Sequence, residues 1–172
     1  FALGSGGGAM VLERTSDKKR YAEVLAVGAS TVSEHETSPD AEGVAAITAA
    51  TKAVKASGIH FNDIGYINAH ATGTIVGDQI EYNAMLKILP GRIMTANKGQ
   101  IGHTICSSGI IETAFTALSL RDQITPGIHG LTNPLGNDMI LPMGLAYPID
   151  TEYAIKNNYA FGGRSMSVIL KR

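Results

Sequence analysis

The sequence has few cysteines, little net charge and no long apolar run, the features that mark disulfide-rich, nucleic-acid-binding and membrane proteins. It contains one cysteine, Cys106, and no tryptophan in 172 residues, so no disulfide can form within the chain. Its 14 Lys and Arg residues nearly balance its 15 Asp and Glu residues, which leaves no net field to attract nucleic acid or an anionic membrane. No apolar run approaches a membrane span, and residues 1–4 lack the features of a signal peptide. These absences favour a cytoplasmic globular protein that binds neither nucleic acid nor membrane.

What is present is a pattern of alternating strands and helices. Short apolar runs predict buried strands at 9–12, 22–27, 64–69 and 93–96. Ser38 is predicted to cap a helix over 40–57, and residues 107–120 predict a buried helix whose inward residues are Ile110, Ile111, Ala114, Phe115 and Leu118. The segments 153–159 and 165–170 flank Phe161-Gly162-Gly163 and predict a hairpin. This order favours an α/β fold with a mixed sheet.

Polar residues follow the apolar strands at three places, where open α/β sheets carry their sites. His70 directly follows the strand at 64–69, Lys98 and His103 follow the strand at 93–96, and Phe161 begins the hairpin turn. Each segment alone has an ordinary alternative. His70 could be a hydrogen-bonded core histidine, Lys98 a lysine that reaches the surface, and the glycines after Phe161 a simple turn.

The order and spacing of these segments is more specific than any one of them. The pattern N-A-H-x-T-x-T-x-x-G-D at 68–78 is followed by K-x-x-x-G-H at 98–103, Glu112 and F-G-G at 161–163. This arrangement resembles the β-ketoacyl-acyl-carrier-protein synthases of the elongating type, over essentially the whole chain. The resemblance implies the C-terminal half of a thiolase-like fold, with a mixed five-stranded sheet between helix layers. It assigns residues 1–27 to the last strands of a preceding half and residues 28–172 to the C-terminal half.

The resemblance also implies a reaction. It is a decarboxylative Claisen condensation of an acyl thioester with malonyl-acyl carrier protein, in fatty acid or polyketide synthesis. His70 and His103 would donate neutral N–H groups to the enolate oxygen, with Lys98 and Glu112 orienting them. The nucleophilic cysteine would come from the N-terminal half, so we expect this chain alone to be inactive.

Further roles follow from the same resemblance. Thr72 and Thr74 would bond the phosphopantetheine arm of the carrier protein, and no covalently bound cofactor is expected. Phe161 would gate the site, with its backbone N–H and the adjacent Gly162 at an oxyanion hole. Three residues would surround a monovalent cation: Asn68, Glu112 and Asn157. The expected partners are the acyl carrier protein, the cysteine-bearing N-terminal half and a second copy in a homodimer.

The chain departs from the family pattern at several positions. Ser5 replaces a glutamate in the glycine run, Ala160 replaces the glycine before Phe161, and Arg164 replaces a threonine. Cys106 replaces a glycine and is predicted to be a small buried residue at a helix start. Lys156 replaces a small polar residue beside the cation ligands, and we hypothesise that its ammonium group takes the place of the cation.

Several alternatives stay open from the sequence. The chain could be a non-catalytic partner subunit that shapes chain length, although both histidines are retained, or an inactive half-domain. A thiolase is disfavoured because a second catalytic cysteine is lacking. A dinucleotide site is disfavoured because the glycine run at 4–8 precedes a strand rather than linking a strand to a helix, and no pair of His or Cys residues has zinc-ligand spacing.

Overall fold

The computed structural model describes residues 1–14, 20–32, 36–37 and 39–172. Its helices, with two 3₁₀ turns, are α1 (Val44–Ser57), η1 (Phe61–Asp63), α2 (Ile75–Ile88), α3 (Lys98–Ile101), η2 (Ile105–Ser107) and α4 (Ser108–Asp122). Its strands are β1 (Glu23–Thr31), β2 (Ile64–Asn68), β3 (Ile93–Thr95), β4 (Ile124–Pro126), β5 (Ala146–Pro148), β6 (Tyr153–Ala160) and β7 (Arg164–Lys171). Within this described part of the chain, no helix combines the length and apolarity that crossing a membrane requires.

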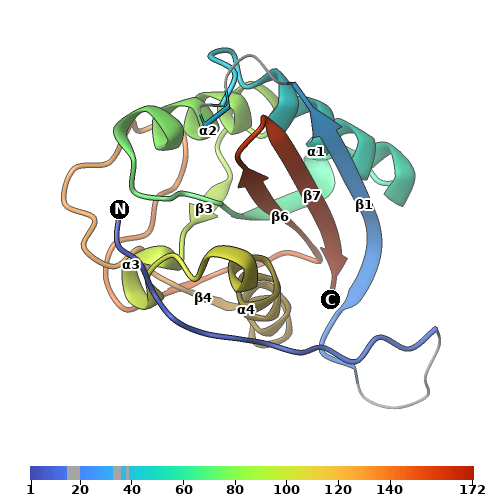
Figure 1. Ribbon diagram of the computed structural model, residues 1–172. Helices are drawn as coiled ribbons and strands as arrows, with labels where there is room; N and C mark the ends of the chain where they lie inside the picture. The colour runs from blue at the N-terminus through green and yellow to red at the C-terminus, as the bar shows by residue number, and fades with distance from the viewer. Residues whose placement is uncertain (15–19, 33–35, 38) are drawn as a thin grey trace.

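A mixed sheet of five strands forms the centre of the fold (Figure 1). Its strand order is β1-β7-β6-β2-β3, with β2 parallel to both β3 and β6 and with β7 antiparallel to β1 and β6. The parallel strands are connected through helices, whereas β6 and β7 form the predicted C-terminal hairpin. The prediction of an α/β fold with a mixed sheet is therefore confirmed.

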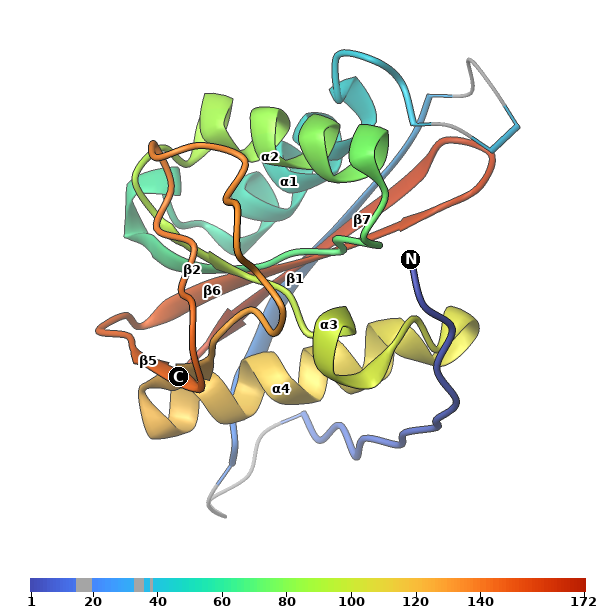
Figure 2. The ribbon, with the colours of Figure 1, turned by 90° about the vertical axis from the view of Figure 1, so that its left-hand side faces the viewer.

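Helices cover both faces of this sheet. Helices α1 and α2 lie on one side and α4 on the other (Figure 2). Small residues let α1 approach closely: a Cβ at Gly28 of β1 would lie 2.0 Å from the carbonyl oxygen of Ala49. The alanines on the inner face of α1, such as Ala50 and Ala53, are fully buried.

The start of α1 differs from its prediction. The predicted cap, Ser38, lies outside the described residues. Helix α1 begins at Val44, after Gly43 in the left-handed conformation at φ 68°. The Asp40 carboxylate accepts the Val44 N–H and, at 3.1 Å, the Ala45 N–H. Asp40 thus satisfies the first amides of the helix.

Two predictions about apolar segments are wrong. Residues 9–12 form no strand, and Val11 is 90% exposed. The N-terminal segment instead runs past α3 and along α4 (Figures 1 and 2), where Gly6 and Gly8 approach Ile111 and Ile110.

The predicted inward stripe of α4 is also not the buried one. Leu118 is exposed and the other four predicted residues are only partly buried, whereas the buried residues are Ser108, Glu112, Thr116, Ser119 and Leu120. The cause is that Glu112 pairs with lysines on the sheet side, and this turns the apolar face of α4 outward.

The predicted boundary between residues 27 and 28 lies inside β1, which pairs with β7 along its length. Strand β1 therefore belongs to the same sheet as the rest of the chain. The assignment of residues 1–27 to a preceding half stays a prediction.

Candidate active site

Two histidines meet beside the carboxyl end of the parallel strands. His70 follows β2, and His103 follows α3, which itself follows β3. Their ring centroids are 5.4 Å apart and the rings are nearly perpendicular, at 86°. Because β2 and β3 are parallel neighbours, their carboxyl ends bring these two segments together. A third ring, of Tyr159 on β6, lies edge-on to His70 at 5.5 Å.

The backbone at His70 is held in an unusual conformation by a buried carboxylate. Ala71 has φ 32°, in the left-handed region that a residue with a Cβ rarely adopts. The N–H groups of His70 and Ala71 donate to the two oxygens of Glu81, at 2.9 and 2.8 Å. Burial raises the pKa of Glu81, and these two N–H donors lower it. Glu81 on α2 therefore fixes the direction in which His70 points.

Hydrogen bonds assign the proton positions on both imidazoles. The Ile105 N–H donates to His103 Nδ1 at 3.1 Å, so this nitrogen is an acceptor and the proton is on Nε2. Lys98 Nζ, which can only donate, is 3.4 Å from His70 Nδ1, which places the His70 proton on Nε2 as well. Asn158 Oδ1, at 3.3 Å from the same nitrogen, would accept from it in the other tautomer; we assign the proton to Nε2 because the Lys98 ammonium group cannot accept and lowers the pKa of His70. Each ring thus has an Nε2–H donor, for which no acceptor is found among the described residues.

A buried ion cluster lies behind the histidines. Glu112 of α4 is fully buried and its carboxylate lies between two lysines. Lys98 Nζ is 2.5 Å from Oε1 and also donates to the His70 carbonyl oxygen. Lys156 Nζ, from β6, is 2.9 Å from Oε2, as an ion pair rather than an aligned hydrogen bond.

This cluster and the burial around it keep both imidazoles neutral. Burial, together with the charges of Lys98 and Lys156, lowers the pKa of His70 to about 2. Burial and Lys98 also lower the pKa of His103, against the opposing effect of Glu112. Two neutral Nε2–H groups near each other, in a site with fixed dipoles and little water, are suited to stabilise an oxyanion.

Comparison with known proteins decides the family. Residues 21–132 match the family described as β-ketoacyl synthase, C-terminal domain. The chain belongs to the β-ketoacyl synthase family. The resemblance inferred from the sequence motifs is therefore confirmed.

Relatives within this family are similar over the whole chain. The chain is 35% identical to 3-oxoacyl-[acyl-carrier-protein] synthase 2 of Vibrio harveyi, over 100% of this chain and 44% of that protein. It is 38% identical to the protein of the same name in Mycobacterium leprae, over 98% of this chain and 42% of that protein. The chain thus spans less than half the length of these β-ketoacyl synthases.

Solved structures show the same fold. A β-ketoacyl synthase from Burkholderia phymatum superimposes with a TM-score of 0.82 at 30% identity, over 88% of this chain and 38% of that one. A ketosynthase in complex with its chain length factor, from Xenorhabdus doucetiae, gives 0.78 at 31% identity, over 90% of this chain and 40% of that one. The thiolase-like fold expected from the sequence is confirmed.

The structure brings four predicted site residues of this β-ketoacyl synthase chain into contact and places the others around them. His70, His103, Lys98 and Glu112 form the centre already described. Thr72 and Thr74 share a hydrogen bond at 3.0 Å between their hydroxyls, in the turn between His70 and α2.

The predicted gating segment lies at the tip of the β6–β7 hairpin. Phe161 is 75% exposed, and the Gly162 N–H donates to the Glu36 carbonyl oxygen at 2.8 Å. Gly162 and Gly163 have φ of 76° and 66°, so this turn uses the freedom of glycine. Tyr159 connects the hairpin to His70.

The predicted cation ligands point in different directions. Asn68 Nδ2 donates to Asn97 Oδ1 at 2.8 Å, while its Oδ1 is buried without a partner among the described residues. The Asn157 side chain turns away from Glu112: its Oδ1 accepts from Ser167 at 2.8 Å and its Nδ2 lies 3.1 Å from Met85 Sδ. Both Glu112 oxygens face lysines. The residues present therefore fit a bound cation poorly.

Sequence reasoning missed Glu81 and misplaced Cys106. Glu81 is a charged residue inside the buried stripe of α2, next to Tyr82 and near Ala84 and Met85, and that position was the available signal. Cys106 was predicted to be buried but is exposed in η2, a turn in which no residue is buried.

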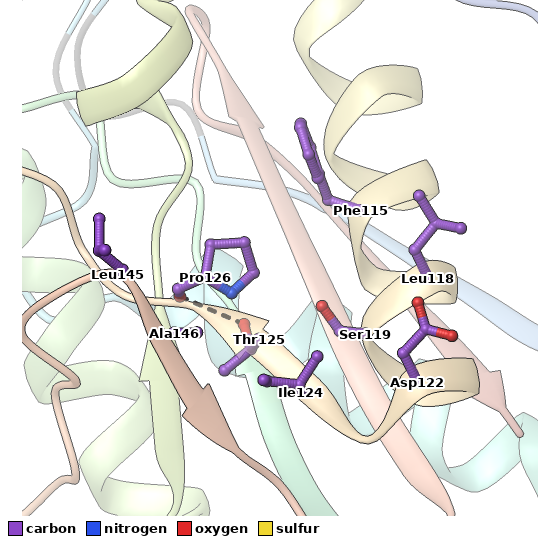
Figure 3. A pocket seen from close by; sticks show the side chains of 9 residues that line it. All are labelled: Phe115, Leu118, Ser119, Asp122, Ile124, Thr125, Pro126, Leu145 and Ala146. Carbon is purple, nitrogen blue, oxygen red and sulfur yellow. Dashed lines mark hydrogen bonds between the residues drawn. The ribbon is translucent and has the colours of Figure 1, made fainter.

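One groove lies apart from the histidines. It has a volume of about 230 Å³ and lies between the end of α4, β4 and β5. Figure 3 shows Phe115, Leu118 and Asp122 of α4 on one side of it and Leu145 on the other. It shares no lining residue with the ion cluster or the histidine pair.

Proposed function

We propose that the protein containing this chain catalyses the decarboxylative Claisen condensation of an acyl thioester with malonyl-acyl carrier protein. The observation that carries the proposal is the pair of neutral imidazoles, both with Nε2–H donors, backed by the Lys98–Glu112 ion pair. Membership of the β-ketoacyl synthase family supports it. Fatty acid or polyketide synthesis would use this reaction.

The histidines would act on the charge that develops during decarboxylation. When the bond between the malonyl C2 and its carboxylate breaks, CO₂ leaves and the electron pair forms an enolate. Its oxygen would accept from the Nε2–H groups of His70 and His103. Because both imidazoles are neutral donors, they stabilise this oxygen without transferring a proton. The enolate carbon then attacks the acyl thioester, and the thiolate leaves.

Lys98 and Glu112 would act by positioning. Lys98 holds the backbone and ring of His70, and Glu112 holds Lys98. Thr72 and Thr74 would form hydrogen bonds to the phosphopantetheine arm of the carrier protein. The Phe161 side chain would open or close the acyl side of the site, and the backbone at Phe161 and Gly162 would lie at the oxyanion hole. We infer that a preceding half of the protein supplies the nucleophilic cysteine, since Cys106 is the only cysteine in this chain.

The partners and location follow from the same proposal. The acyl carrier protein would deliver both substrates, and a second copy of the protein would form the homodimer in the cytoplasm. One solved structure shows a ketosynthase in complex with its acyl-carrier protein. That structure is 24% identical to this chain, so the likeness supports the fold and not the partner.

The test is a condensation assay on the protein at its natural length. The 3-oxoacyl product formed from acyl- and malonyl-carrier protein would be measured by mass spectrometry. His103→Ala and His70→Ala should each lower the turnover by about 10²- to 10³-fold. The control is His60→Ala, an exposed histidine before η1, which should leave the rate unchanged.

Two outcomes would refute the proposal. Full activity in both histidine variants would exclude their role as oxyanion donors. Absence of activity in the natural-length protein, with activity appearing only in an added ketosynthase, would instead favour the non-catalytic chain-length subunit.

A further inference from the structure

The ammonium group of Lys156 has the surroundings of a coordinated cation. The side chain is 1% exposed although it carries a charge. Lys156 Nζ lies 2.9 Å from Glu112 Oε2 and 3.4 Å from the Ala69 carbonyl oxygen, and it also donates to the Asn157 carbonyl oxygen. These neighbours are one carboxylate oxygen and two backbone carbonyl oxygens. Such oxygens are the ligands that alkali cations take in proteins.

The charges around this position are balanced without an added ion. Two buried lysines, Lys98 and Lys156, contact Glu112, and the buried carboxylate of Glu81 interacts with both lysines through space. Two positive and two negative charges sum to zero. Burial lowers the pKa of Lys156, and the carboxylates of Glu112 and Glu81 raise it while Lys98 lowers it. A further cation at Glu112 would lie within a few ångströms of two ammonium groups and would be repelled by both.

From these contacts we propose that Lys156 is a built-in substitute for a monovalent cation beside Glu112. Lys156 is a positioning residue. It pairs with the Glu112 carboxylate, which in turn pairs with Lys98. It also donates to the carbonyl oxygen of Ala69, the residue before His70. The site would therefore assemble without Na⁺ or K⁺. This proposal concerns ion binding and stability, so it can fail while the proposed condensation activity stands.

Removing the ammonium group should recreate a cation site. In Lys156→Ser, three oxygens would be left facing the vacated space: Glu112 Oε2, the Ala69 carbonyl oxygen and the Asn157 carbonyl oxygen. The new hydroxyl adds a fourth. Lys156→Met is the matched control, because it also removes the charge but fills the space with an apolar chain. Lys171→Ser, on the neighbouring strand, removes a partly exposed lysine that pairs with Glu152.

The experiment measures the melting temperature of the natural-length protein at constant ionic strength. The salts compared are KCl, NaCl and tetramethylammonium chloride, the last of which is too large for the site. Lys156→Ser should melt about 10 °C below the unchanged protein in tetramethylammonium chloride. It should recover about 5 °C in KCl or NaCl at a concentration 100-fold above the dissociation constant. The unchanged protein, Lys156→Met and Lys171→Ser should show no difference between the salts.

Other outcomes would overturn the proposal. One is a melting temperature of the unchanged protein that rises specifically with K⁺ or Na⁺. Another is a Lys156→Ser variant that is destabilised equally in all three salts, which would make Lys156 an ordinary buried ion-pair partner. If the variants do not fold, crystals of the unchanged protein soaked in Rb⁺ or Tl⁺ decide: an anomalous peak beside Glu112 refutes the substitution, and its absence supports it.

Discussion

The layer between the sheet and helices α1 and α2 is mostly apolar, whereas the layer between the sheet and α4 holds paired charges and hydroxyls. The first contains alanines of α1 with Met85 and Leu89. In the second, α4 turns Ser108, Glu112 and Thr116 inward. Apolar packing tolerates changes that keep the volume, but a buried charge requires a specific partner. The α4 layer should therefore respond to loss of charge and the α1/α2 layer to loss of volume.

The largest effect is expected where one change leaves two buried charges without a partner. Glu112→Ala removes the carboxylate that lies 2.5 Å from Lys98 Nζ and 2.9 Å from Lys156 Nζ. We expect it to lower the free energy of unfolding by about 4 kcal/mol or more, measured by urea denaturation followed by circular dichroism. The control, Glu152→Ala, removes an exposed partner of Lys171 and should cost about 0.5 kcal/mol or less. Equal losses in the two variants would contradict the comparison.

A slightly smaller loss is expected from a volume change in the apolar layer. Leu89 follows α2 and is 1% exposed. Leu89→Ala should cost about 3 kcal/mol through lost burial and a residual cavity, in the same urea experiment. Leu145→Ala is the control, since Leu145 is 96% exposed. If the proposed function holds, the Leu89 variant should keep the turnover of the unchanged protein at temperatures where it is folded.

The stability of the fold should depend on pH through His70, and a change in the apolar layer should leave this dependence as it is. The pKa of His70 is about 2 in the folded chain, against about 6.5 in an unfolded chain. Between these values the unfolded chain binds one more proton at this position, so stability falls as the pH drops below about 6.5. From pH 7 to pH 5 this amounts to about 2 kcal/mol.

The measurement compares urea denaturation at pH 7 and pH 5 for the unchanged protein and His70→Gln. The variant should lose about 2 kcal/mol less than the unchanged protein over this range. Leu89→Ala, in the apolar layer, should lose as much as the unchanged protein does. The same loss in the His70 variant and the unchanged protein would show that His70 is not kept neutral by folding.

The sequence alone predicts the sheet better than it predicts the orientation of α4. The hairpin of β6 and β7 follows from alternation and a glycine turn, which are local signals. The inward face of α4 depends on Lys98 and Lys156, which arrive from other elements. An apolar stripe therefore predicted the wrong face, since the hydrophobic pattern does not record where a buried charge finds its partner.

The candidate site shows the same limit. The family resemblance of the motifs predicts His70, His103, Lys98 and Glu112 as site residues, and the structure brings these four together. The position of Glu81 in the buried stripe of α2 signals a special role. The sequence does not identify its partners, because these are backbone N–H groups, which every residue possesses.

The smallest expected effect comes from a hydroxyl in the α4 layer. Tyr66 is fully buried, and its hydroxyl lies 2.8 Å from those of Thr95 and Thr125. Tyr66→Phe keeps the ring but leaves two buried threonine hydroxyls short of a partner, so it should cost about 1 to 2 kcal/mol in the urea experiment. The double variant Tyr66→Phe, Thr125→Val also removes one of those hydroxyls. Its loss in the free energy of unfolding should therefore be smaller than the sum of the losses in the two single variants. Strict additivity would mean that the hydroxyls do not act as one network, and that the polar character of this layer is confined to the ion cluster.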